Sequence, residues 1–283
     1  MALFYNQATL SYNNNVVSSN IVSGELVEVL SATKTALVDT YKTGDKITYI
    51  ISIINSGSAA FTNLTITDNL GAYKADTLDL VPLTYVKDSV RYYSNGALQP
   101  PLTVADDEPL TITGVSVPAN GNATVIYQAT VNQFAPPVVE SVITNEATIS
   151  GNNITQIVVN ETISALSQPD LSISKSISPD SVTENGQITY TFIIQNSGNV
   201  PASQEDSIVV NDVFNPILKS ISVTLDGKPL SAETDYSYDE TTGVFTTTAG
   251  RITLDAAEYM QETQTGAWLV TPAMTTLQVT GTV

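Results

Sequence analysis

The sequence predicts an all-β protein built from two tandem immunoglobulin-like antiparallel β-sandwiches, with a further strand at the N-terminus. Three observations predict this: the chain repeats itself, its apolar residues fall in short runs rich in Val, Ile, Thr and Tyr between turn sequences such as NSG and PANGN, and no long segment has helical periodicity. A chain of 283 residues suffices for two domains, each with its own core. We expect an N-terminal strand and linker at 1–30, a complete domain 1 at 31–166, and a domain 2 at 167–283 that lacks its last strand.

The composition argues against several classes of function. Asp and Glu outnumber Lys and Arg by 28 to 10, and the net charge of −18 argues against nucleic acid or an anionic membrane as a partner. The chain has no Cys and no His, which removes thiol and imidazole catalysis, the common zinc sites and disulfides. We therefore expect no enzyme activity, no cofactor and no metal site. Carboxylate pairs such as Asp106 and Asp107 fit a solvated turn better than a catalytic dyad.

The repeat indicates the order of strands in each domain. The matched stretches are TKTALVDTYKTGDKITYIISIINSG (33–57) with SKSISPDSVTENGQITYTFIIQNSG (174–198), LTITDNL (64–70) with IVVNDVF (208–214), and NATVIYQATV (122–131) with MTTLQVTGTV (274–283). In the first copy a loop and one more strand, ITNEATISG (143–151), follow the last of these. The second copy contains no counterpart of that strand, so we expect domain 2 to have an unfilled position in its sandwich.

A sequence similar to this missing strand occurs near the start of the chain, where NQATLSYNNN (6–15) resembles NEATISGNN (145–153). We expect the N-terminal strand to act as a donor that inserts into domain 2 of a neighbouring copy by β-augmentation. The expected donor-strand residues, which alternate along one face, are Asn6, Ala8, Leu10 and Tyr12. Such contacts propagate head to tail into a homopolymer unless they close a ring. Two alternatives stay open: the strand folds back onto its own chain, or it is a free tail.

Alternation along the predicted strands places polar residues of each repeat on an otherwise apolar face. In domain 1 these are Lys34, Asp68 and Asn145, and in domain 2 they are Lys175 and Asp212, with Asn6 of the neighbouring copy in the position of the asparagine. A buried lysine or aspartate is costly unless it is paired, so the members of each set should meet. The residues by themselves predict a lysine–aspartate ion pair with an asparagine hydrogen bond.

The same residue types in the same strand positions resemble the triads of bacterial pilins and adhesins that form spontaneous isopeptide bonds. The resemblance implies that the Lys34 amine attacks the Asn145 carboxamide under the influence of Asp68, with release of ammonia. It implies an equivalent bond in domain 2 between Lys175 and Asn6 of the neighbouring subunit. Burial suits this chemistry, because it lowers the pKa of a lysine and raises that of an aspartate. An ion pair and a covalent bond both stay open at this point.

The chain as a whole is similar to the Ig-like repeats of uncharacterised function that are widespread in bacterial and archaeal surface proteins. The similarity rests on residues 33–57, on ITD at 66–68 and on TNEATISG at 144–151, and it covers domain 1 fully and domain 2 up to its missing strand. It implies an extracellular location on a cell or spore surface. The start, MALFYNQATL, lacks a basic segment before an apolar run, and no stretch approaches about 18 apolar residues, so neither a signal peptide nor a membrane span is expected.

Two functions from different classes follow. The first is a structural subunit of an extracellular filament or surface appendage, assembled by donor-strand exchange in the manner of the endospore appendages of Gram-positive bacteria. The second is a monomeric surface adhesin that binds a ligand through loops at the ends of its sandwiches. A dependence of self-association on residues 1–20 would distinguish them. The ligand of an adhesin, or of the fibre, is not predicted.

Overall fold

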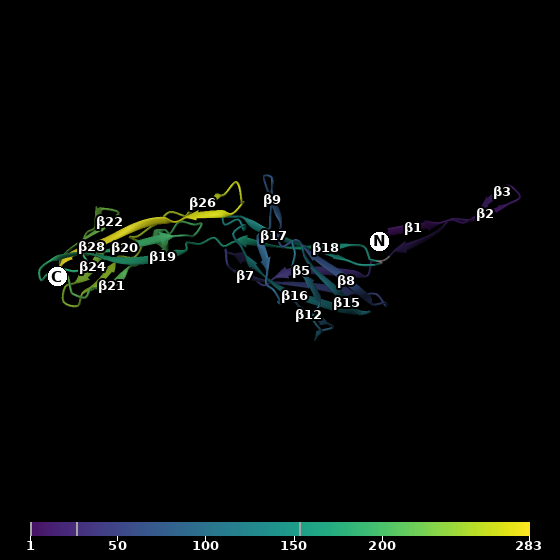
Figure 1. The fold of residues 1–283 in the computed structure, drawn as a ribbon, viewed down its shortest axis with the longest axis horizontal. Helices are drawn as coiled ribbons and strands as arrows, with labels where there is room; N and C mark the ends of the chain where they lie inside the picture. Colours follow the sequence, from purple (N-terminus) through teal and green to yellow (C-terminus); the bar gives the residue numbers. More distant parts are fainter. Residues whose placement is uncertain (1, 27, 153) are drawn as a thin grey trace. The chain divides into compact units, whose positions relative to one another are not determined.

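The computed structural model describes residues 2–26, 28–152 and 154–283 (Figure 1). Among these residues the regular structure is β-strand, apart from one short 3-10 helix, η1 (Gln204–Asp206). The predicted all-β class is confirmed. Within the same described part of the chain, no helix has the length and apolar character needed to cross a membrane.

The chain divides into two compact units. The first contains the residues up to Asn132 together with Ile143–Ile163, and the second contains Gln133–Val142 together with Ser164–Val283. Each unit has its own sheets and its own buried core, so each is described by itself.

The described residues of the first unit form two six-stranded sheets. One sheet has the order β13 (Ala97–Leu98), β12 (Arg91–Ser94), β16 (Gly121–Val131), β7 (Lys46–Asn55) and β5 (Leu30–Ala36), with β11 (Leu83–Tyr85) also paired to β16. The other sheet has the order β14 (Thr103–Ala105), β15 (Leu110–Val117), β8 (Phe61–Asp68), β17 (Val142–Ser150), β18 (Ile157–Ala165) and β6 (Thr40–Tyr41). A separate hairpin joins β9 (Tyr73–Ala75) to β10 (Leu78–Leu80).

The core of the first unit lies between these sheets, because alternate side chains of each strand point inward. The buried apolar residues of β7 and β16 are Ile47, Tyr49, Ile51, Ile53, Ala123, Val125, Tyr127, Ala129 and Val131. From the other sheet β8 and β15 contribute Leu64, Ile66, Leu110 and Ile112. Each large apolar side chain buried in this way stabilises the fold by about 1.5–3 kcal/mol. A charged residue at an inward position of such a sandwich therefore needs a specific partner.

The second unit reproduces one sheet of the first and part of the other. Its five-stranded sheet has the order β19 (Leu171–Ser178), β20 (Gln187–Asn196), β28 (Ala273–Thr282), β22 (Lys219–Leu225) and β23 (Lys228–Pro229). Its second sheet has three strands, β21 (Asn211–Val213), β25 (Val244–Thr247) and β24 (Tyr236–Asp239). A hairpin of β26 (Glu258–Gln261) and β27 (Trp268–Thr271) completes the unit. By sequence correspondence β21 takes the place of β8, and no described strand of this unit takes the places of β17 and β18.

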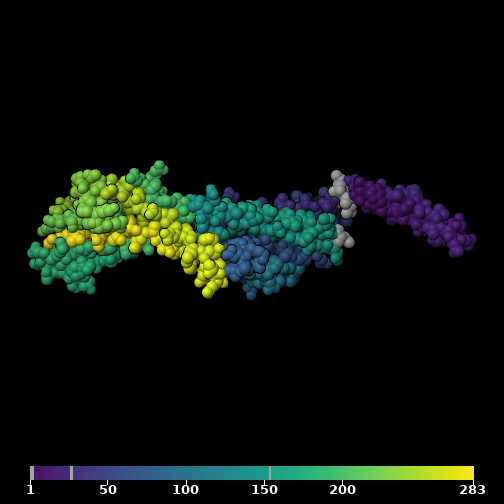
Figure 2. Space-filling view, turned by 90° about the horizontal axis from the view of Figure 1, so that it is seen from above, coloured from purple at the N-terminus to yellow at the C-terminus, as the bar shows by residue number. Residues whose placement is uncertain are grey.

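Residues 2–26 form a β-hairpin rather than the single strand expected from the sequence. β1 (Ala2–Asn6) pairs antiparallel with β4 (Val22–Leu26), and β2 (Thr9–Tyr12) pairs with β3 (Asn15–Ser18). Figure 2 shows this segment, in purple, as a narrow extended strip of atoms. Its exposed large apolar side chains are Leu3, Phe4, Tyr5, Leu10, Tyr12, Val16, Val17, Ile21 and Val22. Because exposed apolar surface of this extent marks binding surfaces in soluble proteins, the hairpin is a candidate for a partner-binding segment.

The asparagine of the repeated NSG sequence holds an equivalent turn in both units. Asn55 is buried, donates from Nδ2 to the carbonyls of Ala59 and Pro118 at 2.8 Å each, and accepts from the Gly57 amide at 2.9 Å. Asn196 makes the same set of hydrogen bonds in the second unit. The side chain thus ties the end of one long strand to a loop that is distant in sequence, which explains why the repeat retains this residue type.

Replacing Asn55 by Ala should destabilise the first unit by about 1–3 kcal/mol, because two backbone carbonyls and one backbone amide lose the buried side chain that pairs with them. Asn160 in β18 is exposed, so Asn160→Ala is a matched control within the same unit. Urea unfolding, followed by tyrosine fluorescence, measures the difference. Equal midpoints for the two variants would contradict the structural role of Asn55.

Candidate functional site

A buried polar cluster occupies the core of the first unit. It consists of Lys34 from β5, Asp68 at the end of β8 and Asn145 from β17. The parity of each strand turns these side chains inward, as the sequence predicts, and the structure brings the three together from both sheets. The side chains of Lys34 and Asp68 have no exposed surface, and Asn145 is fully buried.

A tyrosine that the sequence reasoning missed connects the cluster. Lys34 Nζ lies 2.7 Å from Asp68 Oδ2, and the Tyr127 hydroxyl donates to the same oxygen at 2.6 Å. Asn145 Nδ2 donates to the Tyr127 hydroxyl at 3.0 Å. The other carboxylate oxygen, Asp68 Oδ1, accepts from the Leu70 amide at 3.0 Å. Tyr127 thus links the aspartate to the asparagine.

Two stacked tyrosine rings lie beneath the lysine. Tyr49 and Tyr127 stand opposite each other on β7 and β16, with ring centroids 5.5 Å apart. Lys34 Nζ lies 5.0 Å from the centre of the Tyr49 ring and 5.9 Å from that of Tyr127. The negative faces of the rings favour an ammonium at this position. The paired tyrosines on neighbouring strands are the sequence signal that could have revealed this part of the site.

Burial dominates the electrostatics of the cluster. It lowers the pKa of Lys34 from 10.5 to about 8, although the Asp68 carboxylate acts in the opposite direction. Burial, reinforced by the charge of Asp68, raises the pKa of Tyr127 well above its usual range. At neutral pH the tyrosine therefore stays a hydrogen-bond donor, while the lysine is closer to its neutral form than an exposed lysine would be.

The arrangement provides the groups that amide formation requires. An amine of lowered pKa, a carboxyl group and a carboxamide lie together in a site without water-exposed side-chain surface. Among the described residues, Asn145 Oδ1 has no hydrogen-bond partner within bonding geometry. A carboxamide held by its nitrogen alone leaves its carbonyl free to accept a proton or to develop negative charge.

The corresponding site in the second unit is open to solvent. Lys175 of β19 forms an ion pair with Asp212 of β21, but their side chains are 40% and 17% exposed, against 0% for both members of the first pair. Lys175 Nζ lies 4.4 Å from the centre of the Tyr190 ring. Tyr190 is opposite Val279, so this unit has no equivalent of Tyr127.

The expected donor-strand residues lie in the N-terminal hairpin. Asn6 is opposite Val22, and the side chains of Asn6, Ala8, Leu10 and Tyr12 are exposed there. The hairpin therefore presents the asparagine and the apolar positions that the sequence assigned to the donor. Among the described residues no group of three Asp or Glu side chains, the acidic metal ligands that this composition offers, is arranged to hold a metal ion.

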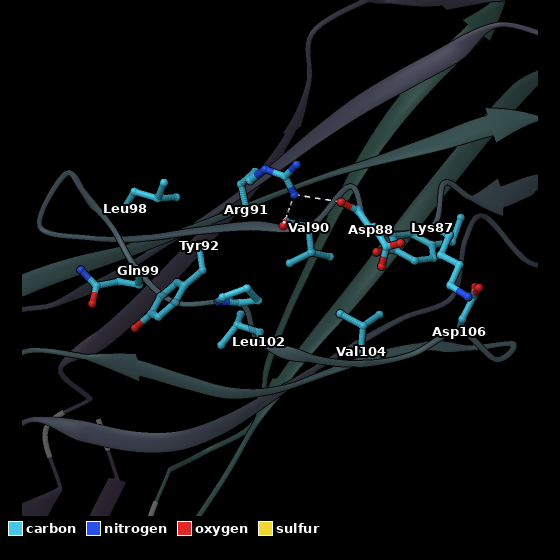
Figure 3. Close-up of a pocket in the computed structure, with 12 residues that line it drawn as sticks. Lys87, Asp88, Val90, Arg91, Tyr92, Leu98, Gln99, Leu102, Val104 and Asp106 are labelled. Carbon is cyan, nitrogen blue, oxygen red and sulfur yellow. Dashed lines mark hydrogen bonds between the residues drawn. The ribbon is translucent and has the colours of Figure 1, made fainter.

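A separate groove of about 690 Å³ lies in the first unit between β11, β12, β13 and β14 (Figure 3). Tyr92, Leu98 and Val104 contribute to its walls. The Arg91 guanidinium donates from Nη1 to the carbonyls of Asp88 and Val90 at 2.8 Å each, so it is engaged within the wall. This groove contains no member of the polar cluster.

Comparisons with known proteins give distant similarities. No family model matches the chain, and no curated protein matches it in sequence. Solved structures that resemble it include the pilus backbone RrgB of Streptococcus pneumoniae (14% identity, 86% of this chain and 55% of that one, TM-score 0.35), BcpA, the major pilin subunit of Bacillus cereus (12%, 96% and 73%, 0.36), and the collagen-binding domain of a Staphylococcus aureus adhesin (13%, 50% and 99%, 0.30). The chain thus spans 55% of the length of the streptococcal structure. These values describe a distant likeness of fold and carry no argument about function.

Removing the carboxylate of the buried pair should destabilise the first unit strongly. Asp68→Asn leaves Lys34 buried without a counter-charge, at an expected cost of about 3–5 kcal/mol. The control is Asp79→Asn, because Asp79 pairs with Lys74 at 2.8 Å on the surface, with both side chains about three-quarters exposed. Denaturant unfolding should show a change several-fold smaller for the control. Similar losses in both variants would mean that burial of the Lys34–Asp68 pair has no special cost.

Proposed function

We propose that this chain is a structural subunit of an extracellular filament at a bacterial cell or spore surface. Copies join head to tail by donor-strand exchange: the N-terminal strand of one copy, with Asn6, Ala8 and Leu10 facing inward, completes the second unit of the next. The observation that carries the proposal is the contrast between two related sites. The lysine–aspartate pair is sealed in the first unit and open in the second.

The element that seals the first site is the one without a counterpart in the second. In the first unit β17 lies beside β8, and Ala147 stands opposite Asp68. In the second unit β21 pairs with β25, and within the described residues no strand occupies its other side. An unpaired strand edge of this kind readily accepts a further strand through main-chain hydrogen bonds. An inserted N-terminal strand would place Ala8 opposite Asp212.

Apolar surface around the open site supports the same occupant. Ile173 and Ile177 flank Lys175 on one face of β19 and are 57% and 44% exposed. Covering each of them would add up to about 1.5–3 kcal/mol to a contact. The N-terminal hairpin presents matching apolar side chains, including Leu10. Because donor and acceptor are different surfaces of one chain, their contact is heterologous and propagates into a filament unless it closes a ring.

The same proposal includes an isopeptide bond between the lysine and the asparagine of each site. In the first unit the neutral Lys34 amine attacks Cγ of Asn145, a new C–N bond forms, the original C–N bond of the carboxamide breaks, and ammonia leaves. Asp68 carries the proton from the attacking amine to the departing nitrogen. The buried cluster supports this step, because the pKa of Lys34 is lowered to about 8. In the filament Asn6 of one copy would bond to Lys175 of the next beside Asp212.

The alternative is a monomeric adhesin. A ligand would then use a surface such as the groove beside Tyr92, since clefts are the usual sites for small ligands. The Arg91 guanidinium of this groove is already engaged with the carbonyls of Asp88 and Val90. A monomeric full-length protein in the assembly test would favour the adhesin.

Full-length protein should form large species that a version lacking residues 1–20 does not form, because only the full chain carries the donor. Size-exclusion chromatography and negative-stain microscopy measure this difference. A ladder that survives boiling in denaturant would add the bond between Asn6 and Lys175. If both versions are monomers of equal stability, donor-strand assembly is wrong and the function as a monomeric adhesin is favoured.

The isopeptide bond of the first unit has a direct readout in the intact mass. The measured mass of the denatured full-length protein should be smaller than the mass calculated from its sequence by one ammonia for the Lys34–Asn145 bond. The variants Asn145→Ala and Asp68→Asn should show no loss of ammonia from this site. An unmodified mass would contradict the bond. A free Lys34 amine would instead make the unfolding free energy rise as the pH increases from about 8 towards 10.5, because the unfolded chain then holds a proton that the folded chain has released.

A further inference from the structure

The β1–β4 part of the N-terminal hairpin has the same strand register as the β17–β18 hairpin of the first unit. In β1–β4, Tyr5 stands opposite Ser23. In β17–β18, the hydroxyls of Thr144 and Thr162 lie 3.0 Å apart, which places these residues opposite each other. The separation is 139 residues from Tyr5 to Thr144 and again 139 from Ser23 to Thr162. A single offset therefore relates both strands, and it is the same offset that relates Asn6 to Asn145.

The second unit has an open position for the second strand as well as for the first. In the first unit β18 lies between β17 and β6, and Tyr41 of β6 is buried. The repeat places residues 181 and 182 where the first unit has Thr40 and Tyr41. These two residues belong to no strand, and Val182 is exposed. By correspondence with the first unit, the second unit would accept one strand beside β21 and another beside residues 181–182.

The inward face of the hairpin has a complementary pair of residues where the first unit has two isoleucines. Ile143 and Ile163 are buried, and the offset relates them to Phe4 and Gly24. Phe4 stands opposite Gly24 and its ring covers it: a Cβ at Gly24 would lie 2.4 Å from Phe4 Cζ. A large phenylalanine and a glycine, which has no side chain, thus correspond to two isoleucines of intermediate size. Such an exchange is expected where both strands face one core of limited volume.

The charge of the hairpin also suits insertion into an acidic partner. The whole chain has a net charge of −18, but Glu25 is the only charged residue of the hairpin. β17 and β18 carry Glu146 and Glu161, and the hairpin has Gln7 and Val22 at the corresponding positions. The hairpin therefore brings little like-charge repulsion to the contact.

From these observations we propose that the donor is the complete hairpin, residues 2–26 of a second copy of this chain. Its first strand pairs with β21, and its second strand, residues 15–26, fills the position beside residues 181–182. The inference rests on the proposed donor-strand assembly and extends it from one strand to two. The correspondence of strand register covers β1–β4, and in β2–β3 the pairing is shifted by one residue, with Thr9 opposite Ser18. At the hairpin tip Tyr12 replaces Gly151, at which a Cβ would lie 2.6 Å from Leu64 Cδ2.

Gly24 provides the test, because it lies in the second strand only. In full-length protein, Gly24→Ile should raise the critical concentration for polymerisation about tenfold, since an overpacked core costs one or more kcal/mol. The double variant Phe4→Ile with Gly24→Ile copies the Ile143–Ile163 pair and should restore the wild-type value. Leu10→Lys places a charge in the first strand and should abolish polymerisation. Sedimentation of polymer over a concentration series measures all four proteins.

The outcomes separate this inference from the function on which it rests. If Leu10→Lys is monomeric but Gly24→Ile polymerises like wild type, the first strand alone is the donor and the hairpin inference is wrong. If Gly24→Ile is impaired and the double variant is impaired equally or more, the two residues do not share one core and the inference is also wrong. If wild type is monomeric, or Leu10→Lys polymerises normally, donor-strand assembly itself fails.

Discussion

The burial of a lysine ammonium is the constraint on which this structure depends. Removing such a charge from water costs several kcal/mol, and a carboxylate offsets the cost only when the surrounding geometry is held in place. In the first unit β5 carries Lys34, β8 carries Asp68, β16 carries Tyr127 and β17 closes the site with Asn145. The polar cluster therefore requires both sheets and the last strand pair at the same time, which couples strand order to core chemistry.

The second unit keeps the ion pair, but among the described residues no strand covers it. Aromatic rings remain beneath the ammonium, with Tyr190, Phe192 and Phe214 all within 5.5 Å of Lys175 Nζ. The side chains of this pair are 40% and 17% exposed, so water can reach the charges there. Covering it removes that water and strengthens the same interactions. One arrangement of residues thus forms a buried core in the first unit and, in the proposed assembly, would form the receptor surface of the second unit.

A hairpin is physically better suited than a single strand to occupy that surface. Two strands that are already paired have lost part of their conformational entropy, so less is lost on insertion. The pairing of β1 with β4 also satisfies one main-chain edge of each strand. A hairpin alone is at best marginally stable in water. In the proposed assembly, docking would therefore stabilise the donor hairpin and the acceptor unit together.

The sequence alone determined the all-β class and the inward direction of Lys34, Asp68 and Asn145, because alternation along a strand and the repeat are local properties. It could not identify Tyr127 as a bridge, since an inward tyrosine resembles an ordinary core residue until Asp68 lies 2.6 Å from its hydroxyl. The second strand of the N-terminal hairpin and the open side of β21 were likewise decided by the tertiary structure. Strand pairing joins residues that are distant along the chain, and no local period of the sequence specifies which edges meet.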